Sequence, residues 1–315
     1  MPRFRLVHTT EWLDRFRSRG HPHVRPLAAG VEGATYLLGD GTVAKVWSRR
    51  RAPELARRSR FYADLLAAGL PFATPDVLRV EEVDGVAVTV ERELPGTPLQ
   101  DRLDLDAPEL PPAAVDCVVT VVRALAGVPA TDAMRRLPVL DEDRPLWTDA
   151  ADFPTALLAL LERRFAAHRD VLRRHVPDID DRYRALRQRI RGLDRIPDTV
   201  LHGDVFGGNV LVDEALRPLS LLDFGFLSSA GDPRLDAGVT GAVMNMYGPH
   251  ARSITTSLTH RLATDLGYPL DALLVYRAAY AVITGNFFTD DGSDGHFAWS
   301  VAQLTDPEVT VALGG

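Results

Sequence analysis

The N-terminal third of the chain is dominated by short runs in which apolar and polar positions alternate, the pattern of half-buried β-strands. The strands expected here run into Ala28-Ala29 and over 34–38, 42–47, 77–82 and 86–94. Gly39-Asp40-Gly41 and Asp84-Gly85 supply the tight turns that antiparallel hairpins need. Pro53 to Gly69 is expected to form a helix, with proline in its first turn and glycine at its end.

Beyond Pro95-Gly96-Thr97-Pro98 the apolar spacing changes to that of amphipathic helices, interrupted by one β-rich island at 199–227. Helices are expected at about 111–127, 151–175, 179–192, 234–247, 249–266 and 269–288. This pattern predicts an α+β protein of two lobes. The N-terminal lobe, 1–95, would hold a small antiparallel sheet and one helix. The C-terminal lobe, 96–315, would be larger and mainly helical, with the hinge near Glu91–Gly96.

The β-rich island contains the most informative polar residues of the sequence. His202-Gly203-Asp204 is followed by Asn209, with two glycines between Asp204 and Asn209 and an apolar strand afterwards. Asp223 ends a second apolar strand, and a turn joins the two strands. Such a hairpin brings an aspartate, an asparagine and a second aspartate to one rim, a set of oxygen ligands that suits Mg²⁺.

A single lysine, Lys45, is present among the 36 Lys and Arg residues. Positions that need only a positive charge are arginine in this chain. We therefore expect Lys45 to be a site where a compact ammonium cannot be replaced by a planar guanidinium, the alternative being chance. Lys45 lies on the third expected strand, shortly after the glycine-containing turn Gly30–Gly33. Phosphoryl transfer requires a strand lysine on the nucleotide phosphates together with a carboxylate and oxygen ligands for metal, so the two halves of the chain predict the same chemistry.

The amino-acid composition excludes several classes of protein. The chain has 315 residues, of which 46% are hydrophobic and 25% charged, as in ordinary globular proteins. Its net charge of −7 argues against a general nucleic-acid binder, and no apolar run approaches the roughly 20 residues of a membrane helix. With one cysteine, an internal disulfide is excluded. We expect a cytoplasmic protein, monomeric or weakly dimeric, that binds neither nucleic acid nor membrane.

The sequence resembles the aminoglycoside phosphotransferase and choline-kinase-like group, which has a protein-kinase-like fold. His202-Gly203-Asp204 with Asn209 matches the catalytic loop of that group, and Asp223-Phe224-Gly225 matches its metal-binding segment. The resemblance, which spans roughly residues 24–290, implies an ATP- and Mg²⁺-dependent kinase for a small hydroxylated molecule, with GTP as an alternative donor. Glycine, not arginine, lies between His202 and Asp204, and no Ala-Pro-Glu segment follows Asp-Phe-Gly. In both features the sequence resembles small-molecule kinases.

The resemblance also implies roles for individual residues. Asp204 would be the catalytic base, Asn209 and Asp223 the Mg²⁺ ligands, and Lys45 the contact to the α- and β-phosphates. The remaining assignments are the nucleotide loop Gly30 and Gly33, the adenine-facing backbone of Arg92, Glu93 and Leu94, and His202 and Asp236 as structural support.

Two features depart from the pattern of this group. The nucleotide loop lacks the serine that many relatives have, and Glu32 brings a negative charge toward the phosphates unless it turns outward. Glu54 is the one glutamate in the expected helix and is predicted to pair with Lys45, although it lies about one turn early. The alternative for Glu54 is a first-turn acid favoured by the helix dipole.

The acceptor is the least determined part of the function. Asp290, Asp291 and Asp294 form an acidic loop, and Asp141-Glu142-Asp143 forms another acidic cluster. Acids near an acceptor site would attract a cationic amino sugar; the alternative is a solvated loop of turn residues. An aminoglycoside, or another hydroxylated antibiotic or amino sugar, is the leading class. The alternatives are a metabolic kinase for choline, homoserine, a hexosamine or a nucleoside-like alcohol, and a catalytically silent nucleotide-binding regulatory module.

Overall fold

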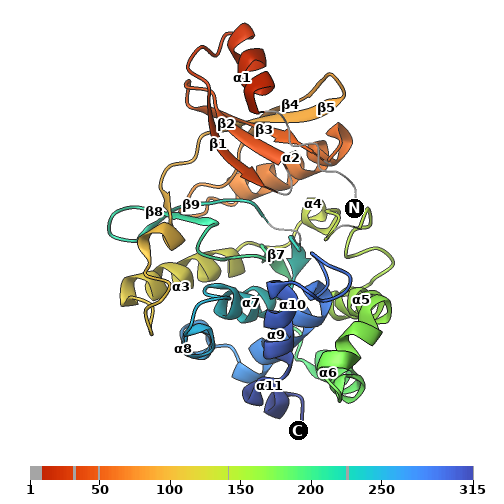
Figure 1. Cartoon of the computed structure of the whole chain (residues 1–315). Coiled ribbons are helices and arrows are strands. Elements are labelled where there is room, and N and C mark those ends of the chain that lie inside the picture. The colour runs from red at the N-terminus through yellow and green to blue at the C-terminus, as the bar shows by residue number, and fades with distance from the viewer. Residues whose placement is uncertain (1–8, 31–32, 49, 141, 225–226, 315) are drawn as a thin grey trace. The chain divides into compact units, whose positions relative to one another are not determined.

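The computed structural model describes residues 9–30, 33–48, 50–140, 142–224 and 227–314 (Figure 1). The chain divides into two compact units. The first consists of Met1–Pro95 together with Ser220–Leu222, and the second of Gly96–Leu219 together with Asp223–Gly315. A sheet-based first unit and a mainly helical second unit confirm the predicted α+β, two-lobed fold.

The first unit is built on a five-stranded antiparallel sheet with the strand order β1-β2-β3-β5-β4. Its strands are β1 (Arg25–Gly30), β2 (Gly33–Leu37), β3 (Thr42–Trp47), β4 (Val77–Val83) and β5 (Val86–Arg92). In the central pair, Lys45 of β3 lies opposite Thr89 of β5, and Val43 lies opposite Glu91. Because side chains alternate along a strand, Lys45 and Trp47 share one face of the sheet with Thr89 and Glu91.

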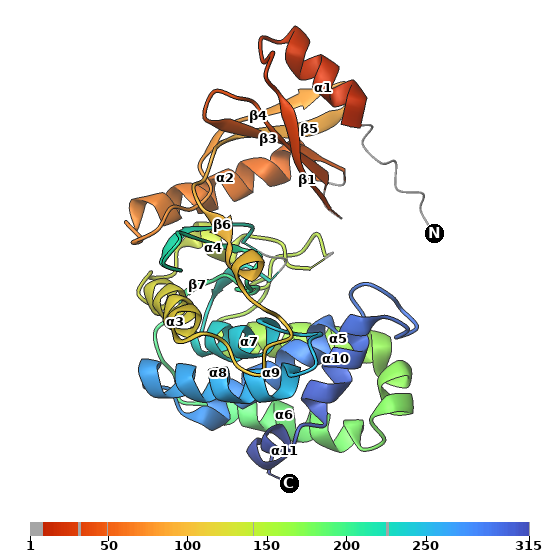
Figure 2. The same ribbon diagram turned by 60° about the vertical axis from the view of Figure 1, so that its left-hand side comes forward.

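Each face of this sheet packs against a helix (Figure 2). On one face, Trp12 and Phe16 of α1 (Thr9–Ser18) pack in a cluster with Tyr36, and the rings of Phe16 and Tyr36 are 5.4 Å apart. On the other face, Leu55 of α2 (Ala52–Ala67) packs against Trp47. Helix α2 confirms the predicted helix. Helix α1 was not predicted, because its two buried aromatics are separated by charged residues.

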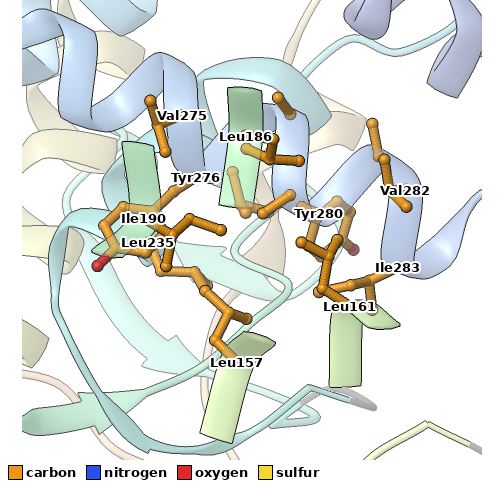
Figure 3. Packing of buried hydrophobic residues seen from close by; sticks show 14 of the residues in the cluster. Leu157, Leu161, Leu186, Ile190, Leu235, Val275, Tyr276, Tyr280, Val282 and Ile283 are labelled. Carbon is orange, nitrogen blue, oxygen red and sulfur yellow. The ribbon is translucent and has the colours of Figure 1, made fainter. Parts of the chain in front are cut away.

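The second unit is built mainly from helices. They are α3 (Pro112–Ala126), α4 (Asp132–Arg135), α5 (Phe153–His175), α6 (Ile179–Gly192), α7 (Arg234–Val243), α8 (Ala251–Leu266), α9 (Leu270–Thr284), α10 (Gly295–Leu304) and α11 (Pro307–Ala312), with the 3₁₀ helix η1 at Leu99–Arg102. Helix α9 is buried at every position from Ala272 to Thr284, and residues of α5, α6 and α7 pack around it (Figure 3). This core supports the segments that follow the short strands.

Short strands hold the loops of the second unit. Strand β7 (Thr199–Leu201) pairs with β10 (Ser229–Gly231), and β6 (Thr97–Pro98) pairs with β8 (Val210–Val212). Strand β9 (Pro218–Leu221) follows β8, and its last residues belong to the first unit, where the Leu221 N–H donates to Ala73 O at 2.9 Å. No sequence pattern indicated that Ser220–Leu222 would join the N-terminal unit.

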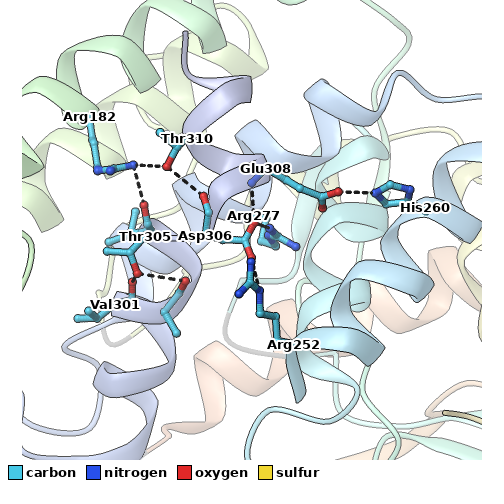
Figure 4. Close-up of polar contacts among 11 residues, drawn as sticks. Arg182, Arg252, His260, Arg277, Val301, Thr305, Asp306, Glu308 and Thr310 are labelled. Carbon is cyan, nitrogen blue, oxygen red and sulfur yellow. Dashed lines mark hydrogen bonds and ion pairs between the residues drawn. The ribbon is translucent and has the colours of Figure 1, made fainter. Parts of the chain in front are cut away.

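The C-terminal helices α10 and α11 were not predicted, because glycine and aspartate interrupt the apolar spacing before them. Asp306 caps α11 by accepting the Glu308 N–H at 2.9 Å (Figure 4). The same carboxylate pairs with the buried Arg277 at 3.2 Å and with Arg252 at 3.6 Å. Within the described residues, no helix has the length and apolar character needed to cross a bilayer.

Gly33 and Gly30 offer a matched test of why glycines stand at the ends of the turn between β1 and β2. A Cβ on Gly33 would lie 1.9 Å from Val46 O, whereas a Cβ on Gly30 would meet nothing within 4 Å. We expect Gly33→Ala to lower the free energy of unfolding by about 1–3 kcal/mol, because β2 must move away from β3. Gly30→Ala should change it by less than about 0.5 kcal/mol. Urea unfolding of both variants checks this, and equal effects would contradict it.

Candidate functional site

Asp204 and Asn209 lie on the loop between β7 and β8. The Asn209 side-chain amide donates to Asp204 O at 2.9 Å, and its nitrogen lies 3.5 Å from Asp204 Oδ2. Gly207 closes the loop against η1, where the Gln100 N–H donates to Gly207 O at 3.0 Å. A Cβ on Gly207 would lie 3.1 Å from Gln100 N, a tight contact, so the loop packs closely against η1 at this glycine. These contacts hold the shape of the loop, and Asp204 lies on it as a half-buried residue.

Gly203 has a backbone conformation that explains the glycine between His202 and Asp204. Its φ is +76°, in the region that residues with a side chain rarely adopt. A Cβ at this position would also lie 2.8 Å from the carbonyl carbon of Leu227. An arginine would therefore strain this loop and displace the segment beside it.

Asp236, in the first turn of α7, holds the backbone of this loop. Its two carboxylate oxygens accept the His202 N–H at 2.7 Å and the Gly203 N–H at 2.8 Å. The side chain is buried, and burial raises the pKa of Asp236 to about 6 although both hydrogen bonds oppose the rise. One carboxylate thus fixes the two residues that precede Asp204.

His202 is fully buried beneath the loop. Its Nδ1 accepts the Asp204 N–H at 3.2 Å, and its carbonyl accepts the Ser228 hydroxyl at 2.6 Å. Its ring packs against Phe224, with the ring centroids 4.5 Å apart. Because Nδ1 accepts a backbone hydrogen bond, His202 orients Asp204 through the main chain.

Asp223 follows β9 and contributes a second carboxylate to the site. Its φ is +34°, an uncommon conformation for an aspartate, and its side chain is exposed. Burial, and then the charge of Asp223, raise the pKa of Asp204 to about 7, while the hydrogen bond from Asn209 opposes the rise. The two carboxylates therefore lie within electrostatic reach of each other. A carboxyl with a pKa near neutrality is suited to accept a proton.

The donor set of this loop fits a divalent cation. Asp204 and Asp223 are carboxylates that repel each other, and the side-chain nitrogen of Asn209 is already engaged, which leaves its oxygen for a metal. In the described part of the chain, no group of three or more His, Cys, Asp or Glu side chains is placed to hold a metal ion. The Asp223 carboxylate and the Asn209 amide oxygen, completed by phosphate oxygens, are a donor set that suits Mg²⁺.

Lys45 belongs to the first unit and has a carboxylate partner that sequence reasoning missed. Its Nζ lies 3.6 Å from Glu91 Oε2, on the neighbouring strand β5. Glu54 is half-buried in the first turn of α2, and its pairing with Lys45 stays a prediction. Side chains alternate along β5, and this alternation places Glu91 on the same face as Lys45. The alternation is the sequence signal that could have identified Glu91 as a partner of Lys45.

The segment predicted to meet adenine ends strand β5. The Arg92 N–H donates to Asp76 O at 3.0 Å, and the Glu93 N–H donates to Gly41 O at 2.9 Å. The Arg92 guanidinium is paired with Asp76 at 2.9 Å. These amides are used within the first unit, so a base would have to contact Leu94 N–H or the carbonyl groups. In the nucleotide loop, Gly30 ends β1 and Gly33 begins β2, and Glu32 lies outside the described residues.

The acids of the predicted acceptor loop have local structural partners. Asp294 caps α10 by accepting the Phe297 N–H at 2.9 Å, and its other oxygen accepts the Thr289 hydroxyl. Burial opposes the effect, yet these hydrogen bonds lower the pKa of Asp294. Asp291 accepts the Ser293 N–H at 3.0 Å in a turn.

Asp290 is exposed, and its carbonyl oxygen lies 3.4 Å from the Asn286 amide nitrogen. Of the second acidic cluster, Asp141 lies outside the described residues, and Glu142 pairs with Arg163 at 2.7 Å.

A cavity of about 470 Å³ in the second unit lies apart from these residues. Trp147, Arg135, Asp198 and Tyr276 line part of it, and Asp204, Asn209 and Asp223 are not among its lining residues. Tyr276 donates to the buried Asp232 at 2.7 Å, and Asp232 also pairs with Arg234. This polar cluster was not predicted, and its charged groups have partners within the protein.

The raised pKa of Asp204 predicts a stability cost that depends on pH. Between pH 3.8 and about 7 the folded protein binds more protons at this carboxyl than the unfolded chain does, so its stability falls as the pH rises through that window. In magnesium-free buffer we expect Asp204→Asn to raise the free energy of unfolding by about 1–4 kcal/mol at pH 8. The gain should vanish near pH 4.

Unfolding measurements at the two pH values check this, with Asp290→Asn as the exposed control that should change little at either. An Asp204→Asn variant that is no more stable than the wild type at pH 8 would contradict the electrostatic account of the site.

The solved structures that this chain resembles include aminoglycoside and macrolide phosphotransferases. Aminoglycoside phosphotransferase APH(3'')-Id from Streptomyces rimosus, in complex with ADP and streptomycin, is 18% identical with a TM-score of 0.56 over 88% of this chain and 99% of that one. A putative aminoglycoside phosphotransferase from Ralstonia eutropha is 17% identical with a TM-score of 0.60 over 96% and 97%. Macrolide 2'-phosphotransferase MphH from Brachybacterium faecium is 17% identical with a TM-score of 0.54 over 95% and 98%.

At these identities the structures show a shared fold. No curated protein matches the chain. The model of the phosphotransferase enzyme family matches residues 23–263, which include Lys45, the Asp204 loop, Asp223 and Asp236. A match of that extent shows that the chain belongs to the phosphotransferase enzyme family, as its His-Gly-Asp and Asp-Phe-Gly segments implied.

Proposed function

We propose that the protein transfers the γ-phosphate of Mg-ATP to a hydroxyl group of a small molecule. The observation that supports this best is the state of Asp204. It is half-buried, burial and Asp223 raise its pKa to about 7, and Asn209, His202 and Asp236 fix its loop. A carboxylate held in this way is suited to take the proton of an attacking hydroxyl.

In the proposed reaction Asp204 accepts a hydrogen bond from the acceptor hydroxyl and orients it. The hydroxyl oxygen forms a bond to the γ-phosphorus, the bond from that phosphorus to the β–γ bridging oxygen breaks, and ADP leaves. The proton of the hydroxyl passes to Asp204. Asn209 and Asp223 would hold Mg²⁺, which neutralises phosphate charge when it is bound. Its charge would also relieve the repulsion between Asp204 and Asp223.

Lys45 is proposed to bind the α- and β-phosphates, with Leu94 and the carbonyl groups beside it receiving the base. ATP is the proposed donor because APH(3'')-Id was solved with ADP. GTP is the alternative, because aminoglycoside 2'-phosphotransferase-IIIa was solved with GDP.

The proposed acceptor is a hydroxylated antibiotic or amino sugar. Streptomycin is bound in APH(3'')-Id, and kanamycin is bound in APH(2'')-IIIa. The acidic loop of Asp290, Asp291 and Asp294 would attract such cationic compounds. These acids have local hydrogen-bond roles as well, so the steering charge would come from carboxylates that are already fixed in place.

A second acceptor class is favoured by exposed aromatics near this loop. Tyr247 is 67% exposed and Phe288 is 54% exposed. A Cβ on Gly295 would lie 3.6 Å from Cε1 of Tyr247, so the Tyr247 ring lies beside the residue that follows Asp294. Such side chains suit an acceptor with an apolar face, and MphH is a macrolide phosphotransferase with the same fold.

The direct test is ADP release with Mg-ATP across a panel of aminoglycosides, macrolides, choline, homoserine, hexosamines and nucleosides. An aminoglycoside or macrolide that is phosphorylated supports the leading proposal. Turnover with choline or homoserine alone would assign a metabolic kinase. Nucleotide binding without turnover on any acceptor would indicate the silent regulatory module.

Asp204→Asn tests the role of the base. We expect it to bind Mg-nucleotide as the wild type does and to lower kcat by about 10²–10⁴, because the hydroxyl loses its proton acceptor. Asp213→Asn, on the turn between β8 and β9, is the control that should keep kcat. Steady-state kinetics and calorimetry check both variants, and near-normal turnover of Asp204→Asn would refute the assignment.

A further inference from the structure

Four side chains form a connected polar row on one face of the first unit's sheet. Lys45 and Trp47 come from β3, and Thr89 and Glu91 come from β5, with Lys45 directly opposite Thr89. The Trp47 indole N–H donates to Thr89 Oγ1 at 3.0 Å, and the Thr89 hydroxyl donates to Glu91 Oε1 at 2.7 Å. Glu91 Oε2 lies 3.6 Å from Lys45 Nζ.

The directions of these hydrogen bonds are fixed by the groups involved. An indole N–H can only donate, so the Thr89 oxygen accepts from Trp47 and its one proton goes to Glu91. Thr89 therefore holds one oxygen of Glu91 and leaves the other toward Lys45. Trp47, Thr89 and Glu91 are each at most 6% exposed, so water does not compete for this row.

The contact to Lys45 is an ion pair that is longer than a hydrogen bond. At 3.6 Å the carboxylate attracts the ammonium through its charge rather than through a short hydrogen bond. The Lys45 side chain is 18% exposed, whereas that of Glu91 is 5% exposed. The ammonium is thus held in orientation by a buried anion while part of the lysine side chain faces solvent, where a phosphate oxygen would bind.

We propose that Glu91 is the positioning residue for Lys45 and that Thr89 and Trp47 fix Glu91. Lys45 and Glu91 lie on adjacent strands of one sheet, so the register of β3 and β5 sets the contact between them. The nucleotide-binding lysine is therefore preorganised before nucleotide arrives. This inference rests on the proposed nucleotide-binding role of Lys45.

Glu91→Gln tests the proposal with little change in shape. The new amide oxygen can still accept from Thr89, but the side chain no longer carries the charge that attracts the ammonium. We expect the Kd for MgADP, measured by calorimetry, to rise by about 5- to 10-fold, the upper range for a partly exposed ion pair that is lost. Glu81→Gln is the matched control, since Glu81 lies on β4, on the opposite face, and pairs with Arg19 at 3.3 Å. It should bind MgADP as the wild type does.

Thr89 provides a second pair of variants that separates positioning from packing. Thr89→Val keeps the branched shape but loses the hydroxyl, and we expect its Kd for MgADP to rise about 3- to 10-fold. Thr89→Ser keeps the hydroxyl and should restore binding although it packs less well. Thermal unfolding of all variants confirms that they are folded at the temperature of the titration. A Thr89→Ser variant as weak as Thr89→Val would overturn the hydrogen-bond role.

The same titration on Glu54→Gln decides between the two candidate partners of Lys45. The inference is overturned if Glu91→Gln binds MgADP within about twofold of the wild type, or if Glu54→Gln loses more affinity than Glu91→Gln. If the wild type binds nucleotide and Glu91→Gln has the same Kd, this inference alone is refuted. A wild-type protein that binds neither adenine nor guanine nucleotide refutes the proposed function and this inference with it.

Discussion

The geometry of the candidate site depends on one buried carboxylate. Asp236 accepts two adjacent backbone N–H groups, those of His202 and Gly203, and so fixes the chain where it turns toward Asp204. Each hydrogen bond to a charged acceptor contributes about 1.5–3 kcal/mol, which offsets the cost of burying the charge. Helix α7, which carries Asp236, packs against α9 at the centre of the second unit. Asp236 thereby anchors to the helical core a loop that has little regular structure of its own.

Two features of the site lower the stability of the folded protein. Asp204 and Asp223 repel each other, and Asp223 adopts a positive φ of +34°. Unfavourable charge and backbone strain of this kind are found at functional sites, where a ligand relieves them. A cation at Asn209 and Asp223, or a proton on Asp204, would relieve the repulsion. The features that lower stability are therefore those on which the proposed chemistry depends.

Much of this architecture could be predicted because the polar residues stand at fixed spacings beside apolar strands. The His202 to Asn209 loop, Asp223 and the helix of Asp236 are local patterns, and the structure places them as one cluster in the second unit. Glu91 was missed because a glutamate at the end of an alternating strand looks like an ordinary surface position. Its partner depends on the register between β3 and β5, which the sequence does not state. The turn role of Asp291 and the capping role of Asp294 were hidden in the same way, since an acidic run does not show which carboxylates accept hydrogen bonds from the backbone.

The most direct test of the central claim is a double-mutant cycle between Asp236 and Asp204, measured as kcat with Mg-ATP and the best acceptor at a temperature where all variants are folded. If Asp236 acts by positioning Asp204, Asp236→Asn should lower kcat by about 10²-fold in the wild-type background, as a misplaced catalytic group does. In the Asp204→Asn background the same change should cost less than about twofold, because the group that it positions is already lost. Effects that multiply across the two backgrounds would show that Asp236 acts independently of Asp204 and would contradict this account.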